Sequence, residues 1–118
     1  MTLYQGQCHC GEIKFEFEAE ALDAALMCNC SICIRKNAVM SKPYFSPEQF
    51  TLLSGQDKLA RYQFGDLDVN HYFCQACGIH TFHDTKYDPD HFRINLNCVE
   101  GIDSRAIEAT YFDGKNQL

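Results

Sequence analysis

Eight cysteines in a chain of 118 residues restrict the possible folds more than any other feature. Seven of them stand in three short clusters, which read Cys8-x-Cys10, Cys28-x-Cys30-x-x-Cys33 and Cys74-x-x-Cys77. A short chain with this many cysteines holds either disulfides or metal ions. A disulfide between near neighbours closes a very small loop and removes little chain entropy, whereas close thiolates can converge on one ion. The spacing therefore predicts that these seven cysteines hold two zinc ions.

The segments around the clusters predict a protein of a reducing compartment. The N-terminus has no basic start followed by an apolar run, so we expect no signal peptide. The longest continuous apolar stretch, residues 24–28, is far too short to cross a bilayer. We therefore expect a cytoplasmic protein without a membrane partner, in a compartment where disulfides are rare.

The charge of the chain argues against a role in nucleic-acid binding. The formal net charge is −6, and seven ionised thiols together with two zinc ions would take it to −9. The longest basic run is the pair Arg35-Lys36. A negative field of this size repels phosphate, so we expect neither DNA nor RNA as a partner.

Length and patterning predict one all-β domain spanning residues 1–118. Ile13, Phe15 and Phe17 alternate with charged residues, which is typical of a half-buried strand over residues 12–18. Further strands are expected over residues 50–53, 59–64, 69–73, 79–83, 92–98 and 107–112, and extended chain over 39–45. The composition of residues 18–26 is compatible with a helix, and Ser46-Pro47-Glu48-Gln49 predicts the start of a short one. Burial in so short a domain is marginal, and bound metal adds stability.

The pair Cys74 and Cys77 has the form of a zinc knuckle, because two intervening residues let both sulfurs face one ion. Gly78 follows, where glycine permits a backbone conformation that a side chain resists. A tetrahedral site needs two more ligands, and Cys8 and Cys10 form a second close pair. A thioredoxin-type redox pair has the same spacing, but no helix is expected behind it to lower a thiol pKa. Two unrelated buried cysteines are the remaining interpretation.

Cys28, Cys30 and Cys33 can occupy three corners of a tetrahedron, which leaves the open fourth position that a catalytic zinc needs. Alternatively, a fourth protein ligand closes a second structural site, the candidates being Cys98, His71, His80 and His83. Cys98 is otherwise expected to be a buried residue on a strand. Arg35 and Lys36 follow the three cysteines directly, either to bind an anion near the zinc or as part of a solvated turn.

The order and spacing of the motifs resemble one known family. The motifs are Gly6-x-Cys8-x-Cys10-Gly11, Cys28-x-Cys30-x-x-Cys33, Cys74-x-x-Cys77-Gly78, Ile94-Asn95-Leu96-Asn97-Cys98 and Tyr111-Phe112-Asp113-Gly114. Together they are similar to the signature of the glutathione-dependent formaldehyde-activating enzymes and the related centromere protein V group. The resemblance runs from about Gly6 to Gly114, nearly the whole chain. Many relatives have histidine at the position of Asn29.

The resemblance implies a β-tent fold, with bent antiparallel sheets tied together by zinc and with little helix. It implies a structural zinc on Cys8, Cys10, Cys74 and Cys77, and a catalytic zinc on Cys28, Cys30 and Cys33. The implied reaction joins formaldehyde to glutathione as S-hydroxymethylglutathione, or runs in reverse as a carbon–sulfur lyase. A small thiol such as glutathione is thus the implied partner.

Two other functions are compatible with the same residues. A non-catalytic zinc module that binds a protein partner or senses metal would need a closed second site or a large exposed apolar patch. Methionine sulfoxide reductases resemble the fold but pair two CxxC motifs, whereas one half here is CxC. A redox cysteine outside the zinc sites would then have to be Cys98.

Overall fold

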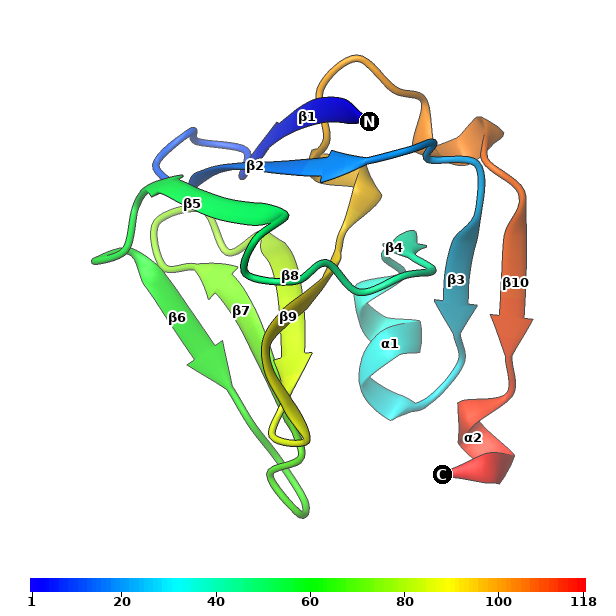
Figure 1. The fold of residues 1–118 in the computed structure, drawn as a ribbon. Coiled ribbons are helices and arrows are strands. Elements are labelled where there is room, and N and C mark those ends of the chain that lie inside the picture. Colours follow the sequence, from blue (N-terminus) through cyan, green and yellow to red (C-terminus); the bar gives the residue numbers. More distant parts are fainter.

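A computed structural model describes residues 1–118, whose ten strands form three small sheets (Figure 1). The first sheet contains, in spatial order, β1 (Thr2–Gln7), β2 (Lys14–Ala19) and β5 (Phe50–Ser54). The second contains β10 (Ala109–Phe112), β3 (Ala25–Cys28) and β4 (Met40–Ser41). The third contains β6 (Leu59–Tyr62), β7 (Val69–Cys74), β8 (His80–Thr85) and β9 (Asp88–Ile94).

The helical segments are all short. They are α1 (Ser31–Lys36), the 3₁₀ turns η1 (Leu96–Cys98) and η2 (Ser104–Ala106), and α2 (Gly114–Gln117). None is long and apolar enough to cross a membrane. The prediction of a mainly β chain with little helix is therefore confirmed.

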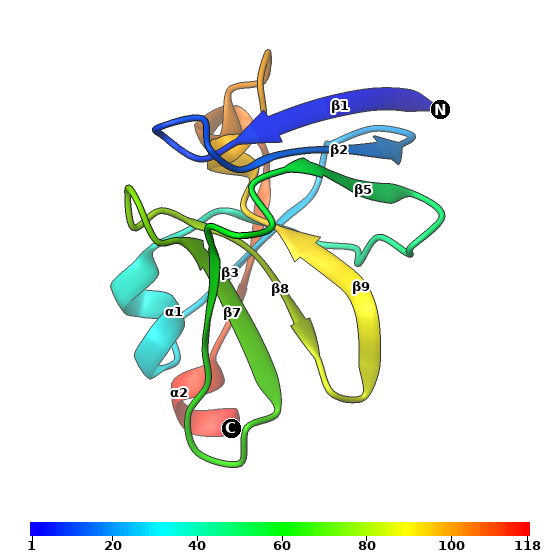
Figure 2. The same ribbon diagram turned by 90° about the vertical axis from the view of Figure 1, so that its left-hand side faces the viewer.

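The three sheets pack against one another at steep angles, with one sheet above the other two. In Figure 1 the β1-β2-β5 sheet lies across the top, the β6–β9 sheet descends on one side, and β3 and β10 descend on the other. In the view of Figure 1 helix α1 lies between the two descending sheets, whereas in the turned view of Figure 2 these sheets overlap below β1, β2 and β5, and α1 stands at their left edge. Residues of α1 and of the four-stranded sheet can therefore face each other.

A cluster of phenylalanines holds the sheets together. Phe15 and Phe17 on β2 are fully buried, which confirms the half-buried strand predicted from the alternation over residues 12–18. The ring of Phe15 meets that of Phe82 edge-on at 5.5 Å between centroids, and Phe50 meets Phe82 at 5.1 Å. Each buried aromatic ring removes a large apolar area from water, so these contacts stabilise the packing of the sheets against one another.

Of two expectations for the first half of the chain, one is wrong and one agrees with the structure. Residues 18–26, compatible with a helix by composition, instead end β2 and begin β3. The alternating burial of β2 continues to Ala19, which is 5% exposed, and thereby favours a strand over helical propensity. For residues 39–45 the sequence predicts extended chain, with Pro43 limiting it to an edge or an irregular position. The stretch contains the short edge strand β4 and a single bridge from Phe45 to Phe92, which agrees with that expectation.

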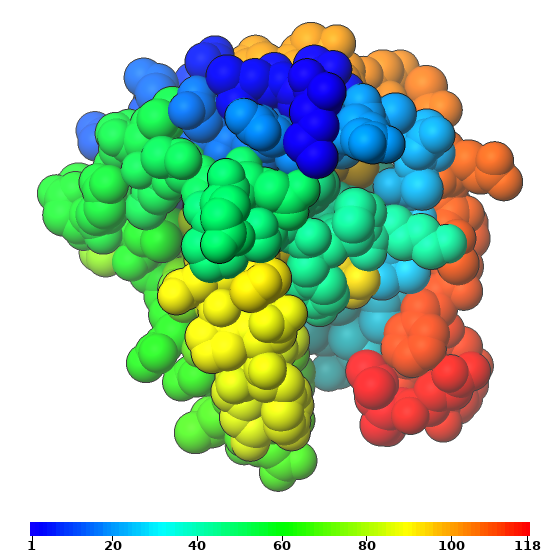
Figure 3. Space-filling view, viewed as in Figure 1, coloured from blue at the N-terminus to red at the C-terminus, as the bar shows by residue number.

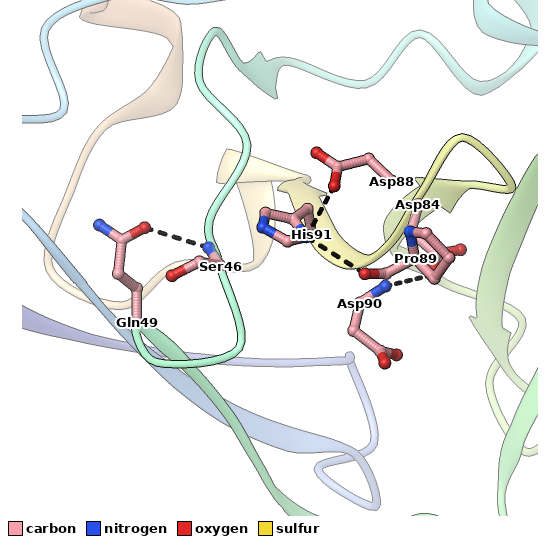
Figure 4. Close-up of polar contacts among 7 residues, drawn as sticks. All are labelled: Ser46, Gln49, Asp84, Asp88, Pro89, Asp90 and His91. Carbon is pink, nitrogen blue, oxygen red and sulfur yellow. Dashed lines mark hydrogen bonds and ion pairs between the residues drawn. The ribbon is translucent and has the colours of Figure 1, made fainter.

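The helix expected to start at Ser46 is absent, because the segment forms a turn. Figure 4 shows the Gln49 side chain accepting a hydrogen bond from the backbone N–H of Ser46, 3.0 Å from N to Oε1. This is the return bond of a capping box, but the chain enters β5 at Phe50 before a helix can propagate. A capping signal alone does not specify a helix when buried strand residues follow at once.

Two differences concern the second half. The strand expected over residues 92–98 ends at Ile94, and Leu96–Cys98 form the 3₁₀ turn η1, in which the Asn95 side chain accepts from the N–H of Asn97. Cys98 is buried as expected, but it lies on this turn rather than on a strand. The sheets are also not wholly antiparallel, since β10 pairs with β3 in parallel, with Phe112 opposite Cys28.

Candidate metal centres

The first group of cysteines joins two hairpins that are distant in the sequence. Cys8 and Cys10 lie in the turn between β1 and β2, whereas Cys74 and Cys77 belong to the turn between β7 and β8. All four sulfurs lie within 4.8 Å of one another. Cys10 Sγ is 3.6 Å from Cys8 Sγ and 3.7 Å from Cys74 Sγ. Four sulfurs around a tetrahedral zinc, at about 2.3 Å each, would stand roughly 3.8 Å apart, so this spacing fits zinc.

The backbone around this group is arranged to support thiolates. The N–H of Ile13 points at Cys8 Sγ, with 3.4 Å between N and S. Although burial raises the pKa of the Cys77 thiol, backbone hydrogen bonds from Cys10 and Ile79 lower it to about 6. Gly78 has φ of 79°, the left-handed conformation expected for the glycine that ends the knuckle. Such hydrogen bonds to the ligands are typical of structural metal sites.

The second group comes from one continuous segment. Cys28 ends β3, Cys30 is the N-terminal cap of α1, and Cys33 lies within that helix. Their sulfurs also lie within 4.8 Å of one another, and all three residues are partly exposed. The N–H of Cys30 points at Cys28 Sγ at 3.4 Å. This helix was not foreseen in the sequence, yet it explains the spacing, because residues three apart share one helix face.

The alternative fourth ligands lie outside this second group. Cys98 directs its thiol to the backbone carbonyl of His80 at 3.6 Å, and burial raises the pKa of that thiol to about 12. The Cys98 sulfur thus belongs to neither cysteine group. The second group consists of the three cysteines alone, and no histidine nitrogen joins them.

The structure separates the two basic residues that follow the second group. Lys36 stands one further helical step of three residues beyond Cys33 and points to the same side, where its Nζ lies 3.2 Å from His71 Nδ1 and 3.3 Å from His80 Nε2. Arg35 lies on the exposed face of α1 and donates to the carbonyl oxygen of Ser31. Of the two, only Lys36 faces the histidines of the four-stranded sheet.

Three polar residues form a row across that sheet. His71 on β7 pairs with His83 on β8, and His83 pairs with Arg93 on β9. Directly paired residues of neighbouring strands point to the same face, so His71, His83 and Arg93, which we call the basic row, all face α1. Sequence reasoning named the histidines only as candidate ligands and gave Arg93 no role. The pattern that could have found the row is the strand register, which the sequence alone does not provide.

The histidines of this region are electrically neutral. Burial and, after it, the nearby positive charge of Lys36 together lower the pKa of His71 to about 4. The same two causes lower the pKa of His80 to about 3. Lys36 donates to His71 Nδ1, so the neutral ring carries its own proton on Nε2.

A cavity of about 330 Å³ lies between the second cysteine group and the basic row. All three cysteines line it together with Lys36, His71, His83 and Arg93, and its apolar walls include Leu26, Met40, Phe112 and Leu118. Figure 3 shows a hollow between the β9 hairpin (yellow) and the C-terminal segment (red), with part of the cyan segment that includes α1 at its back. Ligand sites of this kind combine apolar walls with a few convergent polar groups.

The C-terminal segment packs directly on the second group. A Cβ added to Gly114 would stand 2.6 Å from Cys28 Sγ and 3.0 Å from Cys30 Cβ, so no side chain fits there. Asn29 holds the segment in place, because its Nδ2 donates to Asp113 Oδ1 at 2.9 Å and its Oδ1 accepts from the N–H of Lys115 at 2.9 Å. Asn29, which stands between Cys28 and Cys30, therefore holds the C-terminal segment against the three-cysteine group.

The two donor sets differ in what they can hold. Four cysteine sulfurs fit a closed tetrahedral zinc site, whereas three leave one position for an exogenous ligand. Soft thiolates select zinc over the hard cations magnesium and calcium.

Known proteins share both the sequence pattern and the fold. A family model described as glutathione-dependent formaldehyde-activating enzyme matches residues 3–113. The crystal structure of a Rhodobacter sphaeroides protein from a structural genomics programme superposes with a TM-score of 0.77 at 31% sequence identity. The match covers 90% of this chain and 99% of that one.

Proposed function

This chain belongs to the family of glutathione-dependent formaldehyde-activating enzymes, and from that membership we propose that it is a zinc-dependent enzyme of the carbon–sulfur lyase type acting on a small thiol adduct. The observation that carries the proposal is the three-cysteine group without a fourth protein ligand, opening on a cavity. Glutathione with formaldehyde is the substrate pair that the family name suggests.

Cys28, Cys30 and Cys33 would hold the metal of this site. A zinc bound there would supply a position for a substrate thiolate or for polarising a carbonyl oxygen. Three thiolates donate much negative charge to the ion, which makes it a weaker Lewis acid and a better partner for sulfur than for hydroxide. We therefore expect thiol chemistry rather than hydrolysis.

In the direction of adduct formation, a bond forms between the thiol sulfur and the carbonyl carbon, and the thiol proton ends on the former carbonyl oxygen. His71 lines the cavity, and its buried Nε2 has no hydrogen-bond partner within the protein. We assign this N–H to the carbonyl oxygen, where it would donate as negative charge develops. Leu26 and Phe112 would exclude water that competes for the adduct.

The four-cysteine group is proposed as a structural zinc site. Its ligands come from chain segments more than sixty residues apart, so a bound ion would tie two hairpins together. All eight cysteines are free thiols, which supports a location in the cytoplasm, where thiols stay reduced.

The proposal is tested by elemental analysis followed by magnetisation-exchange NMR with ¹³C-formaldehyde and glutathione. We expect two zinc ions per chain and accelerated exchange between free formaldehyde and the adduct. Cys30→Ser should abolish the acceleration. Cys98→Ser is the matched control, because it changes a cysteine outside both groups and should keep the activity. No acceleration by the wild type, with a cobalt-substituted site whose spectrum ignores glutathione, would favour a non-catalytic zinc module instead.

A further inference from the structure

The cavity beside the three cysteines contains two cations that no carboxylate neutralises. Lys36 Nζ hydrogen-bonds to the imidazoles of His71 and His80 and to no carboxylate. Arg93 donates from Nη2 to the carbonyl oxygen of Lys42 at 2.8 Å and stacks on the ring of Tyr44 at 4.3 Å. The ion pairs of the protein lie elsewhere, at Lys86–Asp68 and His91–Asp88. The nearby negative groups are the sulfurs of Cys33, Cys30 and Cys28, and a bound zinc ion would largely offset their charge. Partly buried cations with so little compensation are unusual, because a charge taken out of water needs a partner.

The same wall has hydrogen-bonding atoms without partners. Arg93 Nε and His83 Nδ1 are buried and contact no acceptor or donor of the protein, and the His83 residue is only 8% exposed. Lys36 uses two of its three ammonium protons on histidines and retains one. All three residues line the one cavity. Buried polar groups nearly always find a partner, so this concentration indicates a ligand that satisfies them together.

The geometry of the strands brings these groups to one place. His83 and Arg93 are direct cross-strand partners on β8 and β9, and thus lie side by side on the same face. Lys36 approaches from α1, on the helix face that also carries Cys30 and Cys33. The cationic groups and the sulfurs therefore border a single space.

The charges of the site leave a positive excess. Three thiolates with a zinc ion sum to −1, Lys36 and Arg93 contribute +2, and the histidines are neutral, which leaves +1. The adduct of a thiol acid has a neutral sulfur and one negative charge, on its carboxylate, so it would neutralise the cavity. Formaldehyde has no charge, so the excess is not explained by the carbonyl partner. An arginine and a lysine that line the same cavity match the charge of a carboxylate, and the planar guanidinium also matches its geometry.

We propose that Arg93, Lys36 and His83 form a carboxylate-binding subsite, and that the substrate of this enzyme is a small thiol acid whose sulfur and carboxylate occupy the same cavity. The choice of a thiol rests on the proposed function, whereas the anion subsite rests on the residues alone. A cavity of about 330 Å³ stands at the small end of ligand sites, which favours a short acid over a long peptide.

The test compares two thiols that differ in one group, mercaptoacetate and 2-mercaptoethanol, added to the zinc-loaded protein. Calorimetry measures both affinities. Since hydrogen bonds to a charged group are strong, we expect mercaptoacetate to bind about tenfold more tightly or better. Lys36→Met and Arg93→Gln should bring the ratio close to one, and glutamine at position 93 can still donate to the Lys42 carbonyl. Arg35→Gln removes an exposed charge from the same helix and should leave the ratio unchanged. Equal affinities in the wild type would overturn the proposal.

Acetate separates the subsite from the zinc chemistry because it has no sulfur. In the wild type, acetate should shift the imidazole NMR resonances of His83, and Lys36→Met should remove that shift. If acetate does so while neither thiol changes the spectrum of the cobalt-substituted protein, the subsite stands and the proposed function fails. If both thiols bind cobalt equally well and acetate leaves His83 unchanged, the subsite is refuted and the proposed function stands.

Discussion

The two cysteine groups present the same donor atom in two different settings. The four-cysteine group unites the β1–β2 turn with the β7–β8 turn, and Cys8 and Cys74 within it are almost fully buried. The three-cysteine group lies within six residues, connects nothing distant, and borders a cavity. When metal ligands come from distant parts of the chain, the free energy of metal binding adds to the stability of the fold. When three ligands come from one segment, the metal can keep an open coordination position for a substrate. The difference lies in sequence separation and solvent access, not in residue type.

The largest expected effect concerns stability. A structural zinc contributes on the order of 10 kcal/mol in small peptides, comparable to the stability of a whole domain. Cys77→Ser should therefore abolish the cooperative thermal unfolding transition, whereas Cys30→Ser should keep it nearly unchanged. Calorimetry measures both, with Cys98→Ser as the control. An unaltered melting temperature for Cys77→Ser would remove the distinction between the groups.

The second largest expected effect is a difference between the two groups in the rate of zinc release. The three-cysteine site is partly exposed and has an exchangeable position, so a chelator should reach its ion first. We expect zinc release in two phases of one equivalent each, monitored by a colorimetric zinc indicator. Circular dichroism should change only in the slow phase. Cys30→Ser should lack the fast phase, and a single phase in the wild type would contradict the comparison.

A smaller effect should come from Gly114→Ala. The added methyl group would stand 2.6 Å from Cys28 Sγ, so either the C-terminal segment or the ligand must move. Changes beside metal ligands typically weaken affinity about tenfold or more, and we expect that loss for the three-cysteine site alone. Competition with a chelator of known affinity measures it. Lys115→Ala is the control, because its backbone N–H still bonds to Asn29.

The smallest effect is a shift in protonation at the basic row. Burial and then Lys36 lower the pKa of His71 from 6.5 to about 4, so the unfolded chain binds more protons between these values. The free energy of unfolding should therefore fall as the pH drops through this window. Lys36→Met should raise the pKa of His71 but leave it below 6.5, since burial remains. Imidazole NMR titration measures this, and Arg35→Gln should cause no change.

Local sequence patterns predicted strand β2 and both cysteine groups, whereas most of the features that were missed depend on contacts between distant parts of the chain. The alternation of Phe15 and Phe17 identified β2, and the spacing of the cysteines identified both groups that the structure assembles. Family membership is confirmed over residues 3–113. The cysteine spacing did not reveal α1, because three ligands in six residues suit a loop as well as a helix.

The basic row was missed for a different reason. His71, His83 and Arg93 are neighbours only through the register of β7, β8 and β9. The bulges that shift this register, between Tyr72 and Phe73 and again between His83 and Thr85, leave no clear mark in the sequence. The parallel pairing of β10 with β3 is equally remote, since its partners lie 84 positions apart.

That parallel pair has a consequence for how the protein is made. All four cysteines of the first group have left the ribosome once residue 77 emerges, but β10 and Gly114 reach the second group much later. During the interval, three thiols that the finished protein partly covers stand open to the surrounding solution. Chains that end before Ala109 and are tethered to the ribosome by an added linker long enough to clear the exit tunnel should therefore be alkylated at Cys28, Cys30 and Cys33, whereas zinc should already protect Cys74 and Cys77. Equal protection of both groups at that length would refute this order. The order of synthesis would thus make the chemically active site the last part of the protein to be sheltered from oxidation.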